Sequence, residues 1–115
     1  MTEKYLLQYL IDCALTCEEC EMRCLSENPE QMARCIELCR DCADICFQAA
    51  RLVQRESQIA ENFLKVCEET CRLCAEECDK HEHLHCKECA NLCLACADHC
   101  HDYFSHSPGQ MPATA

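Results

Sequence analysis

The sequence contains few of the residues that build an ordinary globular core. Tryptophan is absent, and the chain of 115 residues has only three Tyr and three Phe. Aromatic side chains therefore cannot dominate the core in the way that they usually do. Gly occurs once and Pro three times. Because these two residues interrupt regular structure most strongly, their scarcity predicts long helices, and the length fits one domain with one core.

The sequence also lacks the features of exported, membrane-bound and nucleic-acid-binding proteins. No long apolar run occurs, so we expect no membrane-spanning helix and no membrane partner. The first residues, Met1-Thr2-Glu3-Lys4-Tyr5, contain no basic region followed by an apolar segment, as a secretory signal would. We therefore expect a cytoplasmic protein with reduced thiols. The net charge of −11 repels nucleic acid, so no nucleic-acid partner is expected.

Cysteine is the residue in excess, with 17 of 115 positions. In a secreted chain this density would indicate a disulfide scaffold, whereas in a reducing compartment it indicates metal binding. Within each of four blocks the steps between cysteines alternate between three and four residues, which places each block on one stripe of an α-helix. The blocks are Cys13, Cys17, Cys20, Cys24; Cys35, Cys39, Cys42, Cys46; Cys67, Cys71, Cys74, Cys78; and Cys86, Cys89, Cys93, Cys96, Cys100.

The second half of the chain repeats the first. An offset of 54 residues (67 − 13) carries Cys13 onto Cys67 and Cys35 onto Cys89. This duplicated hairpin predicts an all-α fold, an antiparallel up-down-up-down four-helix bundle with a cysteine-lined core. We expect helices near residues 3–25, 29–55, 58–80 and 85–105 in one domain over 1–105, followed by a flexible C-terminal tail over 106–115.

Capping signals set the expected starts of two helices. Asn28 as the N-cap, Pro29 at the first helical position and Gln31 three residues after the cap predict the start of the second helix. Ser57 predicts the cap of the third helix. The connections are short, so neighbouring helices are expected to be antiparallel.

Antiparallel packing predicts how the cysteines stack. Each level is expected to hold one cysteine from every helix, and Cys86 lies one step beyond the last level. At one end of this stack we expect an ordinary apolar core with Leu6, Leu10 and Leu64 (the apolar end). The other end carries His81, His83, His85 and Met32 (the histidine end). The predicted levels are Cys13/Cys46/Cys67/Cys100, Cys17/Cys42/Cys71/Cys96, Cys20/Cys39/Cys74/Cys93 and Cys24/Cys35/Cys78/Cys89.

The arrangement of thiols favours Cu(I) over other metals. Cysteines four residues apart on a helix have Cβ atoms about 5–6 Å apart, which suits two sulfurs binding one soft ion. Soft thiolate sites select Cu(I), Zn²⁺ or iron–sulfur clusters. One Cu(I) per thiolate leaves the core neutral, whereas Zn²⁺ on four thiolates leaves negative charge buried. The Cys-x2-Cys-x2-Cys spacing of many iron–sulfur proteins is absent. We therefore expect multiple Cu(I) ions per chain, with a Zn²⁺ or mixed-metal thiolate buffer as the alternative.

All 17 cysteines are candidate metal ligands. His81, His83, His85 and Met32 are further candidates, because their place at the histidine end suits transient capture of Cu(I). The alternative for the histidines is an ordinary solvated loop. His99, His101 and His106 fall outside the cysteine stripe, and we expect all three on the surface.

The four Cys-x3-Cys-x2-Cys-x3-Cys blocks, with the run Lys80-His81-Glu82-His83-Leu84-His85-Cys86-Lys87-Glu88-Cys89 before the last helix, resemble the bacterial copper storage proteins. The resemblance covers roughly residues 3–104 and is closest to the cytosolic branch of that family. It implies a homotetramer of bundles, Cu(I) held inside each bundle and uptake at the histidine end. It also implies a role in copper homeostasis rather than catalysis, with Cys86 as an additional ligand at the histidine end.

Two other functional classes remain as alternatives. A metallochaperone usually exposes one cysteine pair, whereas these thiols are expected to be sequestered. A thiol redox enzyme also contains Cys-x2-Cys, as in Cys17 and Cys20, but here the pair lies in the middle of a helix without a βαβ unit. The sequence therefore predicts storage and no enzyme activity.

Overall fold

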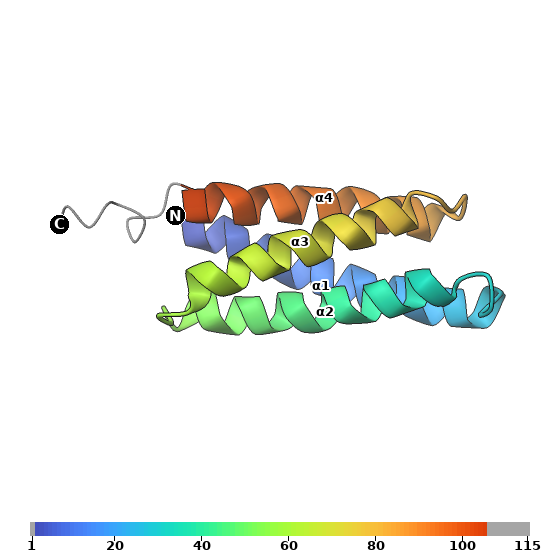
Figure 1. Cartoon of the computed structure of the whole chain (residues 1–115), viewed down its shortest axis with the longest axis horizontal. Coiled ribbons are helices and arrows are strands. Elements are labelled where there is room, and N and C mark those ends of the chain that lie inside the picture. The colour runs from blue at the N-terminus through green and yellow to red at the C-terminus, as the bar shows by residue number, and fades with distance from the viewer. Residues whose placement is uncertain (1, 106–115) are drawn as a thin grey trace.

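The computed structural model describes residues 2–105, which form a bundle of four helices. Figure 1 shows how these helices lie side by side. The predicted all-α class is confirmed, and the expected tail over 106–115 lies outside the described residues. Within the described part, no helix is long and apolar enough to cross a membrane. The helices are α1 (Thr2–Glu27), α2 (Ala33–Gln54), α3 (Ala60–Cys78) and α4 (Leu84–Ser105).

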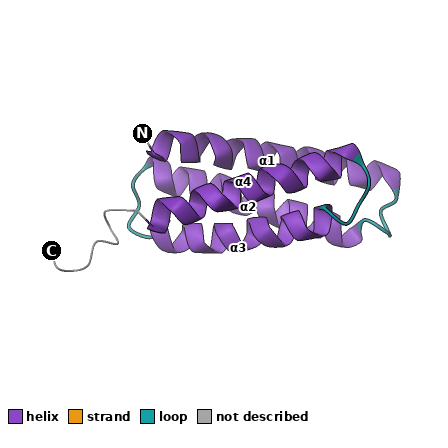
Figure 2. Ribbon diagram, turned by 90° about the horizontal axis from the view of Figure 1, so that it is seen from above, coloured by secondary structure: helices purple, strands orange, loops and turns teal. Residues whose placement is uncertain are grey.

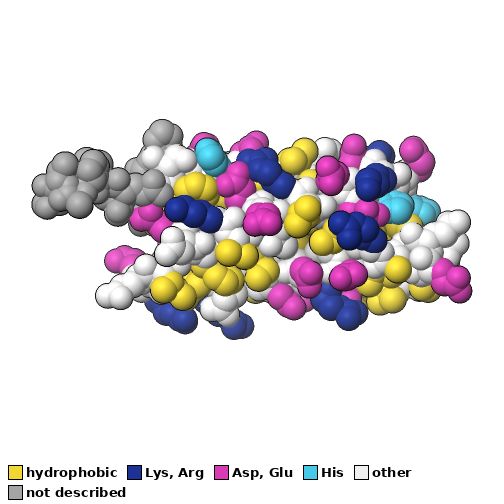
Figure 3. All heavy atoms as spheres, viewed as in Figure 1, with side chains coloured by type: hydrophobic (Ala, Val, Ile, Leu, Met, Phe, Trp, Pro, Cys, Tyr) yellow, Lys and Arg dark blue, Asp and Glu magenta, His cyan; other side chains and the backbone are white. Residues whose placement is uncertain are grey.

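The helices surround a single core in chain order. α1 packs against α2 and α4, and α3 packs against the same two helices. Figures 1 and 2 show that the connections α1–α2 and α3–α4 lie at one end of the bundle and the connection α2–α3 lies at the other. The histidine end is therefore formed by residues 28–32 and 79–83. Figure 3 shows histidine side chains gathered at that end.

The apolar end is packed as the sequence predicts. Leu6, Leu10 and Leu64 are at most 1% exposed, and Val53 is 4% exposed. Tyr103 packs against this cluster and is half-buried. Burying one such aliphatic side chain contributes about 1.5–3 kcal/mol, so these residues stabilise the bundle without any metal.

The start of α2 differs from the prediction. The helix begins at Ala33, and residues 29–32 form a turn, so Pro29 is not the first helical residue. The Met32 N–H donates to the Asn28 carbonyl at 2.9 Å, and the Gln31 N–H reaches the Asn28 side-chain oxygen at 3.4 Å. Asn28 therefore stabilises the reversal between antiparallel helices rather than the first turn of α2.

The connection between α2 and α3 contains a further departure from the prediction. α3 begins at Ala60, and the Ser57 hydroxyl accepts from the Ile59 N–H at 3.2 Å in the preceding turn. Glu56 has a φ of 54°, in the left-handed region. Its N–H donates to the Val53 carbonyl at 3.1 Å, and the Ser57 N–H donates to the Leu52 carbonyl at 2.9 Å. This is a Schellman motif with Glu at the position that usually holds Gly.

Candidate metal centre

The cysteines of each helix lie on the face that points toward the bundle axis. All 17 cysteines are free thiols, and each is at most 1% exposed. Sulfur atoms from different helices lie close together, as in Cys35 and Cys78 at 3.5 Å and Cys17 and Cys93 at 3.6 Å. The core is therefore a continuous column of thiols inside the bundle.

The predicted levels are correct between α2 and α3. Each cysteine of α2 contacts the α3 cysteine that antiparallel stacking assigns to it. The two helices are joined by a short connection at the apolar end, which fixes how far one slides along the other. The sulfur pairs are Cys46–Cys67 at 3.8 Å, Cys42–Cys71 at 3.7 Å, Cys39–Cys74 at 3.8 Å and Cys35–Cys78 at 3.5 Å.

The predicted levels are wrong between α1 and α4. The Cys13 sulfur lies 3.7 Å from Cys93, although the prediction paired it with Cys100. Similarly, Cys20 contacts Cys86 at 3.9 Å, where the prediction gave Cys93. No short connection joins these two helices, so side-chain packing alone sets how far they slide. Cys86 therefore belongs to the stack and does not lie one step beyond it.

Because α4 is displaced along α1 relative to the predicted stacking, the cysteine sulfurs form overlapping groups rather than flat levels. Several groups of four cysteine sulfurs have all their sulfurs within 4.8 Å of one another. Most of these groups take two cysteines from a single helix, whereas Cys20/Cys39/Cys78/Cys89 takes one cysteine from each helix. Cys13, Cys17 and Cys20 each belong to two of the groups. Sulfurs shared in this way suit small soft ions bridged by thiolates better than isolated four-sulfur sites. These groups include Cys13/Cys42/Cys46/Cys71, Cys13/Cys17/Cys42/Cys93, Cys17/Cys74/Cys89/Cys93, Cys20/Cys39/Cys78/Cys89 and Cys20/Cys24/Cys35/Cys86.

Two of the thiols nearest the histidine end, those of Cys24 and Cys86, hold their protons in the empty protein. Burial, followed by repulsion from Cys35, raises the pKa of Cys86 from 9.0 to about 11. Burial also raises the pKa of Cys24, with smaller contributions from Cys35 and Cys86. Cys24 and Cys86 are therefore neutral at pH 7. Binding a metal ion as thiolate must therefore release protons.

His85 is the histidine that reaches the sulfur column. Its Nδ1 lies 3.4 Å from the Cys20 sulfur and 3.6 Å from the Cys86 sulfur, and its side chain is 14% exposed. Its Nε2 lies 3.0 Å from a carboxylate oxygen of Glu27. Met32 is also buried at this end, with 3% of its surface exposed. The structure therefore brings one histidine and one methionine of the candidate set to the end of the column.

The other two candidate histidines contact carboxylates. His81 Nε2 lies 3.0 Å from Glu77, and His83 Nε2 lies 3.5 Å from Glu27. Within the described residues, the polar contacts of these two side chains are with carboxylates rather than with sulfur.

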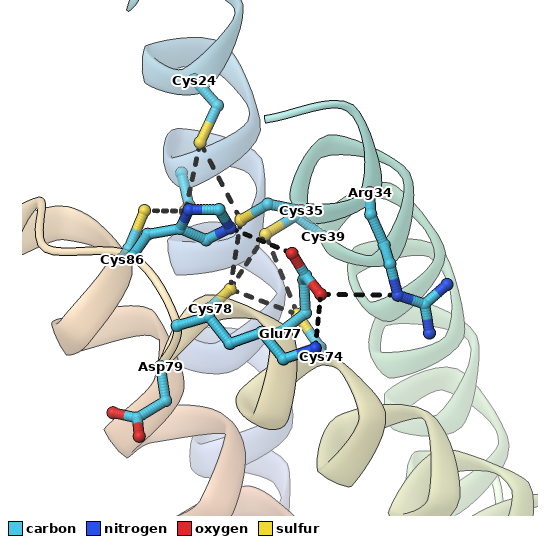
Figure 4. Close-up of polar contacts among 12 residues, drawn as sticks. Cys24, Arg34, Cys35, Cys39, Cys74, Glu77, Cys78, Asp79 and Cys86 are labelled. Atoms are coloured by element: carbon cyan, nitrogen blue, oxygen red, sulfur yellow. Dashed lines mark hydrogen bonds and ion pairs between the residues drawn. The ribbon is translucent and has the colours of Figure 1, made fainter. Parts of the chain in front are cut away.

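Glu77 is a residue of this end that the sequence did not reveal. It is 7% exposed and lies 3.4 Å from Arg34 and 3.4 Å from Lys80, in addition to His81. Figure 4 shows its carboxylate facing Arg34 beside the sulfurs of the histidine end. The neighbouring Glu76 is exposed, and nothing in the sequence distinguishes the two. Glu77 joins the start of α2 to the end of α3 and to the loop that follows.

Of the three histidines assigned to the surface, His106 lies outside the described residues, and His99 and His101 differ from each other. His101 is exposed and lies 3.3 Å from Glu68, as expected of a surface residue. His99 is half-buried, and its ring stacks on Tyr9 with centroids 3.9 Å apart and planes at 20°. His99 is therefore partly covered by the contact between α1 and α4.

Comparison with known proteins gives one family model and several solved structures that resemble this chain. The sequence model of the family described as copper storage protein matches residues 1–105. Among solved structures, a Cu(I)-bound copper storage protein, BsCsp3, is 35% identical with a TM-score of 0.85, over 89% of this chain and 97% of that one. The apo form of copper storage protein 3 from Bacillus subtilis is 36% identical with a TM-score of 0.83, over 86% and 95%.

A second group of similar structures comes from another organism. A cytosolic copper storage protein from Streptomyces lividans, in a form with five coppers, is 29% identical with a TM-score of 0.87. The similarity covers 90% of this chain and 92% of that one. Among curated proteins, none matches this chain significantly.

Proposed function

The chain belongs to the copper storage protein family, and from this premise we propose that it stores multiple Cu(I) ions on the thiolates of its bundle core. The observation that carries the proposal is the set of overlapping four-sulfur groups along the axis. Each sulfur of such a set can bridge two ions, and Cu(I) is the soft monovalent ion that thiolates prefer. One Cu(I) replaces one thiol proton, so the loaded core stays close to neutral.

The same thiols disfavour the two alternative metal functions. A Zn²⁺ buffer would place two negative charges on every four-thiolate site, in a column where the cysteines are at most 1% exposed. A metallochaperone passes its ion through an exposed pair of cysteines, whereas no cysteine is exposed here. Burial slows exchange with other ligands, and slow exchange is a property of a store. The family is one of storage proteins, and we propose that this chain has no catalytic activity.

We assign uptake and release to the histidine end. All 17 cysteines are proposed as ligands, with His85, Met32, His81 and His83 as accessory groups. His85 is supported most directly, because its Nδ1 lies 3.4 Å from the Cys20 sulfur and 3.6 Å from the Cys86 sulfur. The opposite end is closed by Leu6, Leu10 and Leu64.

Cytosolic location and tetramer formation are further parts of the proposal. A structural relative from Streptomyces lividans is a cytosolic copper storage protein, and its compartment suits free thiols. Assembly is supported by an exposed apolar groove between α1 and α2, lined by Leu7, Ile11, Phe47 and Ala50. Analytical ultracentrifugation of the empty and loaded protein tests the tetramer, which a single monomeric species would contradict.

A titration of the reduced protein with Cu(I) tests the storage function. In the presence of a chromophoric Cu(I) chelator we expect about one ion bound per cysteine, which is ~17 per chain. A parallel titration with Zn²⁺ should stop at about four ions. Saturation with Cu(I) at four or five ions would contradict the proposal and support isolated four-sulfur sites.

A further inference from the structure

Two imidazole rings at the histidine end face the same carboxylate. His85 Nε2 lies 3.0 Å from one oxygen of Glu27, and His83 Nε2 lies 3.5 Å from the other. The two rings are stacked, with centroids 5.3 Å apart and planes at 14°. Two nitrogen atoms and one carboxylate therefore converge on a small volume outside the sulfur column.

The nitrogen–oxygen separations of this group are close to those around a tetrahedral metal ion. Zn²⁺ binds nitrogen and oxygen at about 2.0–2.1 Å, which places neighbouring ligands of a tetrahedral site about 3.3 Å apart. The observed separations of 3.0 and 3.5 Å lie on either side of this value. Two His and one carboxylate with a remaining open position form a common ligand set for Zn²⁺.

The charges of this end distinguish Glu27 from Glu77, the buried acid. Glu77 has two cationic side chains beside it, Arg34 and Lys80, so its charge is compensated. Glu27, within the described residues, makes its ion pairs with imidazoles, which are neutral unless protonated. Its side chain is 31% exposed and that of His83 is 48% exposed, so an ion from solution can reach the carboxylate.

We propose that Glu27, His83 and His85 form a separate site for a divalent cation of the Zn²⁺ class, outside the Cu(I) store. The ion takes Nε2 of both rings and the carboxylate. The proton of His85 then resides on Nδ1, from which it is donated to the sulfur of Cys20 or Cys86. The divalent ion on Nε2 thus prevents Nδ1 of the same ring from binding Cu(I), so the site couples divalent cations to copper exchange at this end.

Calorimetric titration with Zn²⁺ of protein already loaded with Cu(I) to its capacity tests the site. The core thiolates are then occupied, and we expect one equivalent of Zn²⁺ to bind. Replacing His83 with Ala should weaken this binding by at least about tenfold. The matched control is His101→Ala, which removes an imidazole that also faces a single carboxylate, Glu68, at 3.3 Å. That variant should bind Zn²⁺ as the wild type does.

The location of the ion is tested by two spectroscopic measurements. Co²⁺ in place of Zn²⁺ should give d–d absorption without thiolate-to-metal charge transfer. NMR of ¹⁵N-labelled histidine should show His85 with its proton on Nδ1 once Zn²⁺ is bound. Equal Zn²⁺ affinity in the wild type and in His83→Ala, or thiolate charge-transfer bands that grow with Co²⁺, would overturn the site. Copper capacity is measured on the same samples, so failure of this site is distinguishable from failure of the storage function.

Discussion

The Nδ1 atom of His85 lies 3.4 Å from the sulfur of Cys20, across the contact between α4 and α1. Glu27 holds the other nitrogen of the ring at 3.0 Å, so the imidazole is fixed in orientation. A neutral imidazole with Nε2–H donated to a carboxylate presents an unprotonated Nδ1. His85 is therefore placed to bind a Cu(I) ion on its way to the outermost thiols.

Replacing His85 with Ala should slow Cu(I) uptake by roughly tenfold. This corresponds to an increase of about 1.4 kcal/mol in the activation free energy of uptake. Final capacity should change little, because the core thiols remain. Stopped-flow measurement of uptake from a Cu(I) chelator gives the rate. His101→Ala, at the opposite end, should load at the wild-type rate. Equal rates for His85→Ala and wild type would show that His85 takes no part in Cu(I) uptake.

The stability of the empty protein should fall as the pH rises from about 9 to about 11. The pKa of Cys86 is 9.0 at its ordinary value and about 11 in the folded protein, so the folded state retains this proton when the unfolded chain has lost it. The resulting stabilisation is complete below pH 9 and is lost as the pH passes through 11. Thermal unfolding in reductant measures the effect. Cys86→Ala should show a shallower decline, and an identical pH profile would refute the assignment.

Replacing Glu56 with Gly should stabilise the bundle by about 1 kcal/mol. Glu56 has a φ of 54°, a conformation that costs a residue with a Cβ about 1–2 kcal/mol, and Gly adopts it without this cost. Urea denaturation of the reduced protein measures the change. The control is Glu69→Gly, at an exposed position within α3, which should destabilise by about 1 kcal/mol. A loss of stability in Glu56→Gly would contradict the Schellman geometry.

The reduced, metal-free protein should be folded, because the apolar end packs without metal. Far-UV circular dichroism in strong reductant should show a mainly helical spectrum. Leu10 is fully buried, and Leu10→Ala should destabilise the metal-free form by about 2–5 kcal/mol. Leu15→Ala, at a position 52% exposed on the same helix, should change stability by less than about 0.5 kcal/mol. A disordered spectrum for the metal-free wild type would show instead that copper folds the chain.

Much of this protein follows from its sequence, because a stripe with steps of three and four residues specifies both a helix and the face that it buries. The repeat and the short connections then specify antiparallel neighbours. They place Leu10 at one end of the bundle and His85 at the other. The pairing of α2 with α3 was also predictable, since a short connection limits how far they slide, as Cys46 and Cys67 show at 3.8 Å.

Only the tertiary structure decided the features that depend on contacts between segments distant in the chain. Cys13 meets Cys93 rather than Cys100, because packing alone sets the register of α1 and α4. Glu77 is buried and Glu76 is exposed, since only one of the two faces Arg34. His85 reaches sulfur at 3.4 Å while His83 reaches a carboxylate. Local periodicity determines which face of a helix is buried, but the partner of each side chain depends on how far and at what angle the helices pack.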